Sequence, residues 1–547
     1  MTSPLALGLD FGTETVRALL LDLESGCELG SAVAAYPHGV LSTTLPSGRA
    51  LSPDWALQDP DDWLTALEAA VRGVLATAGA APRSVVGIGV DFTSCTILPT
   101  TLDGTPLCRL ERWADEPHAW PKLWKHHAAQ PQADELTAIA AAHGESWLAR
   151  YGGRISSEWL LPKAMQLVDE APAAFAAADR IVEGSDWIVW QLTGRLLRNA
   201  CAAGFKALWH KRDGYPTPAF LRRLRPELED YFESAGSGEI AACGTDAGPL
   251  LESWAARLGF SPDVRVAVAI IDAHAGALGA GLTAAGPLYL ATGTSTCHLL
   301  LAREDRPVAG ISGAVEDGII SGLVAYEAGQ ASVGDMFDWC ARLVNRSHAD
   351  LTDAAARLRP GASGLLALDW WNGCRTPLVD ADLSGIVLGA TLATPPEALY
   401  RALLEATAFG TRLVRETFAG AGIEVDRLFV GGGLTGNELL LRLYADVTGL
   451  PVHVVASTQP SARGAAVLGA AAARVQPSVA AAAAAVAAPA ARVVEPRSGD
   501  VAVYDDLYAL YRELVAAYGA ADSPLKRLSA LQRAVTAAAG STVPVHA

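Results

Sequence analysis

The chain has 547 residues, of which 59 are acidic and 42 are basic, and its formal net charge is −17. Such an acidic chain repels nucleic acid and anionic lipid, so neither is expected as a partner. The length exceeds the size at which one hydrophobic core stops growing, and this predicts two domains.

The eight cysteines are scattered and form no C-x-x-C pair, which favours reduced thiols over a disulfide framework or a structural zinc site. Residues 1–9 lack the basic start of a signal peptide. No run of 18 apolar residues suggests a membrane span, and the nearest, residues 479–491, is mostly alanine and contains Pro489. We therefore expect a soluble, cytoplasmic protein without a membrane partner.

An apolar run, a Gly-Thr turn and a second apolar run occupy residues 5–22, which predicts a β-hairpin. A glycine at this turn lets backbone N–H groups point into one concavity, where phosphate oxygens can accept hydrogen bonds. Gly12 and Thr13 form the turn, and Asp10 stands beside them. Asp10 either holds Mg²⁺ against the phosphates of a nucleotide or merely shapes the turn.

Short apolar runs alternate with helical patterns along the whole chain, which indicates an α/β protein. Helices are predicted at residues 61–78, 159–170 and 183–192, with Ser185 as the N-cap of the last one. A buried strand is predicted at residues 85–92.

Residues 264–271 also predict a buried strand, and Asp272 follows directly. A carboxylate at the end of such a strand suits a general base, whereas the competing interpretation is an aspartate that caps a helix starting at Ala273. The adjacent His274 is interpreted as a structural hydrogen-bonding residue outside the chemistry.

A second hairpin of the same kind is predicted at residues 287–301, with Gly293, Thr294 and Ser295 at its turn. Two such devices far apart in the chain suggest two related halves that grip one polyphosphate in a cleft. The pair indicates nucleotide-driven phosphoryl transfer, and the boundary between the halves is predicted near residues 280–286.

The glycines of residues 431–436 give a G-x-G-x-x-G pattern between a predicted strand, residues 427–430, and a helix, residues 437–448; another helix is predicted at residues 395–419. A dinucleotide fold would need an acidic residue about 20 positions further on, yet none occurs between Asp446 and Glu495. No G-x-x-x-x-G-K-[ST] pattern occurs either. We favour a loop on which adenine or ribose lies close to the backbone. The alanine-rich residues 479–492 predict surface helix or loop rather than a site.

Several polar residues lie among apolar or small neighbours, as in a site for a hydroxyl-rich ligand. Taken singly, each is more often a core ion pair or a packing residue, so the residues alone leave both interpretations open. The set comprises Asp91, Ser94, Trp124, Lys206 and Glu327. His126 and His127 have no third ligand at a suitable spacing, and no metal is assigned to them.

The two Gly-Thr hairpins, the strand ending at Asp272 and the glycine loop resemble those of the FGGY carbohydrate kinases, a branch of the actin-like ATPase fold. The likeness covers roughly residues 5–470 and includes residues 36–40, 54–60, 89–96, 122–130, 151–159, 271–276, 293–298, 326–330 and 443–449. It implies two actin-like (ribonuclease H-like) ATPase domains, residues 1–282 and 283–547, that flank a deep cleft.

The resemblance implies ATP and Mg²⁺ as cofactors, a ketopentose as substrate, and a role for each residue. Asp272 is then the general base on a sugar hydroxyl, and Asp10 is the residue that meets the metal. The residues implied at the nucleotide are Asp10, Gly12, Thr13, Gly293, Thr294 and Ser295 at the phosphates and Gly432, Gly433 and Asn437 at the adenosine. The residues implied at the sugar are Asp91, Ser94, Trp124, Lys206, Asp272 and Glu327.

Within the family, the matching stretches point to phosphorylation of L-ribulose at O5, a step of L-arabinose catabolism. The alternatives are another acceptor (D-ribulose, xylulose or a polyol), a sugar- and nucleotide-sensing protein without turnover, and an ATPase without a sugar acceptor. The presence of both Asp10 and Asp272 argues against a sensor, which needs no base. A homodimer is left open. Departures from the family pattern at residues 269–270, 435–436 and 459–464 bear on substrate choice and nucleotide affinity rather than on the reaction.

Overall fold

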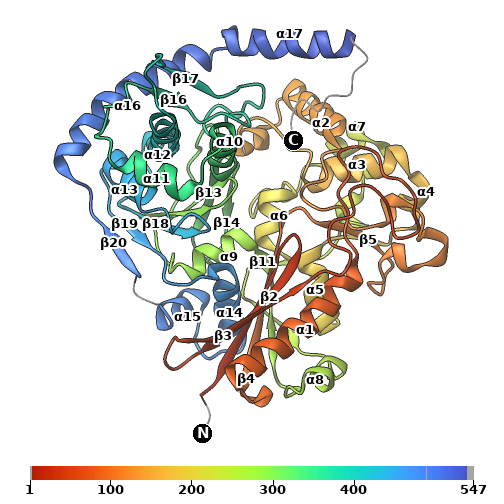
Figure 1. Ribbon diagram of the computed structural model, residues 1–547. Coiled ribbons are helices and arrows are strands. Elements are labelled where there is room, and N and C mark those ends of the chain that lie inside the picture. The colour runs from red at the N-terminus through yellow and green to blue at the C-terminus, as the bar shows by residue number, and fades with distance from the viewer. Residues whose placement is uncertain (1–2, 488–489, 539–547) are drawn as a thin grey trace.

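Two seven-stranded sheets organise the chain, one in each half, and each carries helices on its faces (Figure 1). The computed structural model describes residues 3–487 and 490–538. Each sheet has its own hydrophobic core, and a further apolar cluster joins the two halves. The predicted α/β fold with two domains is therefore confirmed.

The first sheet has the order β3-β2-β1-β4-β10-β9, with β11 also paired to β4. β1 runs antiparallel to β2 and parallel to β4, and all seven of its residues are buried. This central position explains its continuous apolar run, because neither face meets water. The strands are β1 (Leu5–Phe11), β2 (Thr15–Asp22), β3 (Glu28–Ala35), β4 (Val85–Phe92), β9 (Asp246–Pro249), β10 (Arg265–Ala267) and β11 (Ile270–Ile271).

The second sheet repeats this plan in the order β14-β15-β13-β12-β18-β19-β20. Its central β12 runs antiparallel to β13 and parallel to β18, as β1 does to β2 and β4. The strands are β12 (Pro287–Thr292), β13 (Thr296–Ala302), β14 (Gly313–Glu316), β15 (Val324–Gln330), β18 (Arg427–Gly432), β19 (Val452–Val454) and β20 (Arg492–Val494). The shared plan confirms the inference of two related halves.

The helices of the first half are α1 (Pro60–Ala78), α2 (Gln130–His143), α3 (Leu160–Glu170), α4 (Pro172–Ala177), α5 (Gly184–Thr193), α6 (Ala200–Lys206), α7 (Pro218–Leu224), α8 (Glu252–Leu258) and α9 (Asp272–Gly279). Those of the second half are α10 (Gly334–Val344), α11 (His348–Ala356), α12 (Pro396–Gly420), α13 (Glu438–Thr448), α14 (Pro460–Ala472), α15 (Val479–Ala485), α16 (Ser498–Tyr518) and α17 (Pro524–Ala538). Two-stranded sheets complete the fold: β5 (Ile97–Thr100) with β6 (Arg180–Glu183), β7 (Leu197–Asn199) with β8 (Glu239–Ala241), and β16 (Leu366–Leu368) with β17 (Ile386–Leu388).

The predicted hairpins, helices and central strands are confirmed, with two exceptions. The single strand predicted at residues 264–271 is wrong, because β10 and β11 are separated where Val268 exchanges backbone hydrogen bonds with the segment at residues 244–245. Ser185 is not the N-cap of α5, which is Glu183. The Ser185 hydroxyl instead accepts a hydrogen bond from Asn199 at 3.0 Å, a partner that only the tertiary structure supplies.

Helix α14 belongs to the second half of the chain but packs on the first sheet, beside β1 and β4, and against α9 (Figure 1). Glycines make this close approach feasible. A Cβ on Gly8 would lie 1.8 Å from the Ala462 carbonyl oxygen, and one on Gly464 would lie 1.8 Å from that of Ala275. The predicted boundary at residues 282–283 stays a prediction.

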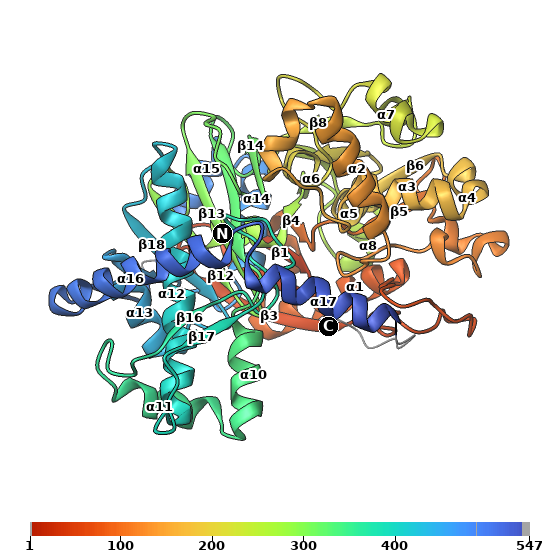
Figure 2. The ribbon, with the colours of Figure 1, turned by 90° about the horizontal axis from the view of Figure 1, so that it is seen from above.

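The alanine-rich segment after α14 forms α15, in which Ala482 and Ala483 are buried against α14; Ala488 and Pro489 lie outside the described residues. Figure 2 shows α16 and α17 following one another across the molecule. Leu528, Leu531 and Val535 of α17 are exposed. None of the helices in the described part of the chain is long and apolar enough to cross a membrane.

Candidate active site between the two sheets

One cavity of about 800 Å³ is lined by residues from both halves of the chain. Nine of the residues predicted at the nucleotide or the sugar line it: Asp10, Gly12, Thr13, Ser94, Trp124, Lys206, Asp272, Ser295 and Glu327. Gly293 and Thr294 belong to the same turn as Ser295, whereas Asp91, Gly432, Gly433 and Asn437 do not line the cavity. The site residues come from many different elements, and the fold brings them together.

The two Gly-Thr turns have similar backbone hydrogen bonds. The Gly12 N–H donates to the Thr15 carbonyl and the Gly293 N–H donates to the Ser295 carbonyl, both at 2.9 Å. Because the turns join corresponding strands of the two sheets, they enter the cavity from opposite halves of the chain. This arrangement can hold a polyphosphate from both sides.

Neither turn glycine is required by backbone conformation, since neither has a positive φ. A Cβ on Gly12 would first meet Arg17 Nη1 at 3.5 Å, and one on Gly293 would first meet the Ser295 carbonyl oxygen at 3.7 Å, both ordinary contacts. The expectation that glycine is needed to aim the N–H groups is therefore not met. What glycine provides is open space beside the turn, where a ligand can approach the backbone.

We expect Gly12→Ala and Gly293→Ala to fold normally but to lose phosphoryl transfer. The added methyl groups would displace a phosphate by about 1 Å, and such a displacement costs on the order of 100-fold in rate. kcat/KM for ATP and the melting temperature of each variant would be measured. Gly499→Ala in α16 is the control, because a Cβ there would meet nothing within 4 Å and Gly499 does not line the cavity. Full activity in both turn variants would remove these turns from the phosphate site.

Asp10 lies at the end of β1, opposite Arg17 of β2 and Asp91 of β4 in the sheet register. It is 4% exposed, and its Oδ2 accepts from Arg17 Nη1 at 3.0 Å. Asp91 is fully buried, and its carboxyl oxygens have no hydrogen-bond partner among the described residues. Burial, and then the charges of Asp10 and Asp272, hold the pKa of Asp91 well above its usual range. Asp91 thus does not reach the cavity, and its predicted contact with the sugar stays a prediction.

Asp272 is the first residue of α9 and lines the cavity. The N-cap position belongs to Ile271, so the competing interpretation of Asp272 as a helix cap is not what the structure shows. Its Oδ1 accepts from the Ala273 N–H at 2.6 Å. Burial and the charge of Asp10 raise the pKa of Asp272 to about 7, although Ala273 N–H and Lys206 act in the opposite direction. A carboxyl group with this pKa can both take up and release a proton near neutral pH.

The pKa of Asp272 predicts the acid side of the pH profile. A base works only when deprotonated, so kcat/KM should fall about tenfold per pH unit below pH 7 and level off above it, where the carboxylate dominates. An ordinary aspartate would keep nearly full activity down to about pH 5. Initial rates with subsaturating sugar between pH 5 and 9 measure this. A flat profile down to pH 5 would contradict the raised pKa.

Lys206, at the end of α6, and Glu327, in β15, form an ion pair in the cavity wall. Lys206 Nζ lies 3.0 Å from both Glu327 carboxyl oxygens, and the two residues are 7% and 8% exposed. Burial alone would lower the pKa of Lys206, but the neighbouring groups, Glu327 foremost, together reverse this and raise that pKa. Burial alone would raise the pKa of Glu327, but the neighbouring positive groups, Lys206 foremost, together reverse this and lower that pKa. The pair is thus charged, and it contacts the cavity where hydroxyl groups could replace or bridge its hydrogen bonds.

Trp124 links the predicted sugar residues to the first turn, because its Nε1–H donates to Thr13 Oγ1 at 3.1 Å. Beneath Ser94 and Trp124 lies the fully buried Lys163, whose Nζ donates to the carbonyls of Cys95 at 2.5 Å and Leu123 at 2.8 Å. Burial lowers the pKa of Lys163 to about 8. Lys163 therefore holds together the two segments that carry Ser94 and Trp124, a role with no sequence signal beyond an apolar helix face.

The glycine loop after β18 lies next to the second turn. Thr292 is opposite Gly432 in the parallel register, and the Gly433 N–H donates to the Thr292 carbonyl at 2.9 Å. Gly432 has φ +99°, and a Cβ there would lie 2.2 Å from that carbonyl oxygen, so the fold itself requires this glycine. Asn437 caps α13 by accepting from the Leu440 N–H at 3.0 Å. Contacts of these three residues with adenosine stay predictions.

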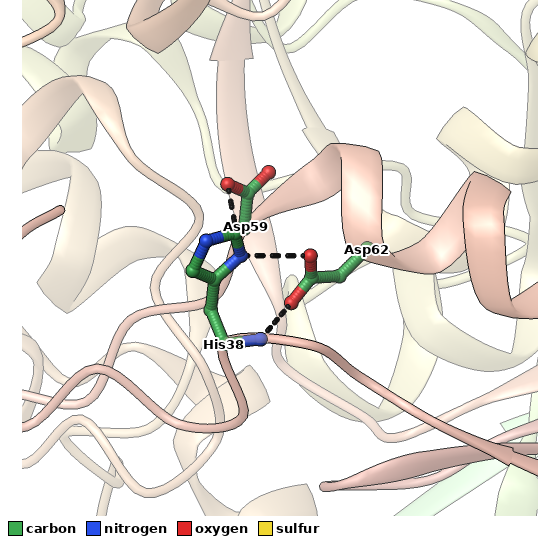
Figure 3. A group of neighbouring side chains, drawn as sticks. All are labelled: His38, Asp59 and Asp62. Carbon is green, nitrogen blue, oxygen red and sulfur yellow. Dashed lines mark hydrogen bonds and ion pairs between the residues drawn. The ribbon is translucent and has the colours of Figure 1, made fainter.

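His38, Asp59 and Asp62 form a cluster beside the first turn (Figure 3). His38 Nδ1 lies 2.9 Å from Asp62 Oδ1, and the backbone N–H of His38 donates to Asp62 Oδ2 at 2.8 Å. The Asp59 carboxylate forms an ion pair with Arg109. The three side chains lie close enough to hold a metal ion, but these hydrogen bonds and Arg109 already account for them. The cluster instead ties residues 36–38 to the start of α1. Tyr36 in this segment donates from its hydroxyl to the Gly12 carbonyl at 3.1 Å, which braces the first turn.

Other residues that line the cavity were not predicted. They include Arg17, Tyr151, Arg154, Trp159, His274 and Arg375. Arg17 could have been recognised from the sequence, because a charged residue in an otherwise apolar strand needs a partner of opposite charge. The others come from segments whose sequence does not reveal which side chain faces the cleft.

The fold and the site define a phosphotransferase whose two halves enclose the reacting groups. The family model described as "FGGY family of carbohydrate kinases" matches with its N-terminal domain over residues 5–279 and with its C-terminal domain over residues 288–473. The chain belongs to the FGGY family of carbohydrate kinases, and it is a sugar kinase.

Curated relatives match almost the whole chain. A "Ribulokinase" of Geobacillus thermodenitrificans is 46% identical over 95% of this chain and 96% of its own length. A "Ribulokinase" of Mycolicibacterium smegmatis is 46% identical over 96% of each chain. Among solved structures, a xylulose kinase from Rhodospirillum rubrum has a TM-score of 0.77 at 23% identity and covers 94% of this chain and 98% of its own. That likeness shows the fold alone.

Proposed function

We propose that the chain transfers the γ-phosphoryl group of ATP to O5 of L-ribulose, as a step of L-arabinose catabolism. Curated relatives that carry the name ribulokinase are 44–46% identical over nearly the full chain, which supports this acceptor. The observation that carries the proposal is the position of Asp272, with a pKa of about 7, in one cavity with the two Gly-Thr turns and the Lys206–Glu327 pair.

In the proposed reaction, the Asp272 carboxylate accepts the proton of the C5 hydroxyl as O5 attacks the γ-phosphorus. The bond between that phosphorus and the β,γ-bridging oxygen breaks, ADP leaves, and the proton remains on Asp272. Phosphoryl transfer of this kind is mostly positioning and charge stabilisation, so few side chains need to react. The backbone N–H groups of the two turns, other than those of Gly12 and Gly293 that donate to Thr15 and Ser295, would hold the phosphate oxygens in line with O5.

Mg²⁺ is proposed at Asp10, beside the first turn. The residues fit a hard cation, because the Asp10 and Asp272 carboxylates both line the cavity and oxygen is the ligand type that Mg²⁺ prefers. When bound, the ion neutralises phosphate charge. Arg17 supplies a second positive charge, holding the Asp10 side chain at 3.0 Å.

Acceptor-dependent ADP release tests the proposal. The protein would be assayed with MgATP and L-ribulose, D-ribulose, L- and D-xylulose, ribitol, L-arabinitol or glycerol. Release that depends most strongly on L-ribulose is the expected result. Preference for another acceptor would change the substrate and keep the kinase, whereas ADP release unaffected by every acceptor would overturn the proposed reaction. A homodimer and a cytoplasmic location stay predictions, the first of which is checked by the molar mass in solution.

A further inference from the structure

His274 is a buried residue of the cavity wall that the proposed reaction does not use. It is 1% exposed and lines the cavity, two residues after Asp272 in the first turn of α9. Neither ring nitrogen has a hydrogen-bond partner among the described residues. A buried polar group without a partner lowers stability, so natural proteins rarely keep one unless a ligand or water satisfies it.

The position of the imidazole points to the ligand. His274 Nε2 lies 3.5 Å from Glu327 Oε2, beyond a good hydrogen bond, and the ring packs on Phe205 with centroids 4.5 Å apart. Phe205 precedes Lys206 in the chain. The ring therefore lies next to the Lys206–Glu327 pair, in the same cavity wall as Asp272, and these are the residues proposed to contact the sugar.

The charge state suits a hydroxyl group. Burial lowers the pKa of His274 to about 4, with Glu327 acting against this shift and Lys206 adding to it. The neutral ring carries one donor and one acceptor nitrogen, and a sugar hydroxyl can pair with either. The same low pKa makes His274 a poorer base than Asp272, so it does not compete for the transferred proton.

We propose that His274 is a sugar-binding residue, whose imidazole hydrogen-bonds a hydroxyl group of the acceptor other than the one that is phosphorylated. This inference rests on the proposed function, since it assigns the residue to the acceptor of that reaction. It replaces the interpretation of His274 as a purely structural hydrogen-bonding residue.

The test combines sugar analogues that each lack one hydroxyl group with a protein variant that lacks the imidazole, and it compares their kcat/KM values. kcat/KM would be measured for L-ribulose and for its 1-deoxy, 3-deoxy and 4-deoxy analogues, with the unaltered protein and with His274→Leu. We expect one analogue to react about 10- to 100-fold less well than L-ribulose in the unaltered protein. In His274→Leu the same analogue and L-ribulose should react almost equally, while KM for ATP stays unchanged.

Two further variants separate this role from a structural one. His274→Gln keeps an amide donor and acceptor and should restore part of the discrimination. His298→Leu removes another fully buried histidine, which faces Thr411 at 3.3 Å, and should leave the discrimination intact. If His274→Leu slows all four sugars by the same factor, or slows none, the proposal is overturned. If the unaltered protein prefers another acceptor, the proposed function fails, and the deoxy analogues of that acceptor decide the role of His274.

Discussion

Asp272→Asn is expected to lower kcat by about 10²- to 10⁴-fold, the usual contribution of a general base. The amide cannot accept the proton of the C5 hydroxyl, but its oxygen can still accept from the Ala273 N–H. Removing the charge also relieves repulsion from Asp10, the charged neighbour that raises the pKa of Asp272 most. Turnover should therefore collapse while the melting temperature is unchanged or higher and the sugar still binds, as measured by single-turnover kinetics and calorimetry.

Asp186→Asn is the matched control, because Asp186 is also a buried aspartate of the first half, but it bonds Asn199 and lies outside the cavity. It should keep turnover within a few-fold of the unaltered protein and lose some stability. The base would have to be sought elsewhere if Asp272→Asn retained more than about a tenth of kcat.

Lys206→Met should abolish sugar-dependent turnover and also destabilise the fold by about 3–5 kcal/mol, because it leaves the buried Glu327 carboxylate without its cation. Chemical denaturation and kcat/KM for the ketopentose measure the two effects. The stability loss alone does not decide between a core ion pair and a sugar contact, which were the two interpretations open from the sequence.

The double variant Lys206→Met/Glu327→Leu separates them. Replacing both members of a buried pair by apolar residues is often neutral or stabilising, so the double variant should recover most of the lost stability. If the pair binds sugar, the double variant is stable and still inactive. If the double variant recovers both activity and stability, the Lys206–Glu327 pair has only a structural role and does not bind the sugar.

Much of the site could be predicted because its chemistry lies in short, local patterns. The turns at Gly12 and Gly293 each sit between two apolar runs, and neighbouring residues in a hairpin need no distant information to be recognised. Asp272 was placed at the cavity for the same reason, although the strand before it is interrupted. The proposed sugar contact of His274 could not be predicted from the sequence. Only the tertiary structure shows that both ring nitrogens lack a hydrogen-bond partner among the described residues.

Burial decided the fate of other predicted residues. Asp91 and Asp10 look alike in the sequence, each near the end of an apolar strand, yet Asp91 is fully buried and outside the cavity lining, while Asp10 lines the cavity. Ser185 has the residue type of an N-cap, but a hydrogen bond from Asn199, which is distant in the sequence, competes for its hydroxyl. Local propensity cannot include partners that arrive from elsewhere in the chain.

The sequence by itself determined the α/β class and the two Gly-Thr hairpins, because periodicity and turn chemistry act over a few residues. Only the tertiary structure decided how the halves meet. Helix α14 can pack on the first sheet because Gly8 and Gly89 leave its backbone room, with a Cβ on Gly89 only 1.7 Å from the Ala465 carbonyl oxygen. In the sequence these glycines look like turn or strand breakers. Their function is steric, and it depends on a segment several hundred residues away, which local patterns cannot show.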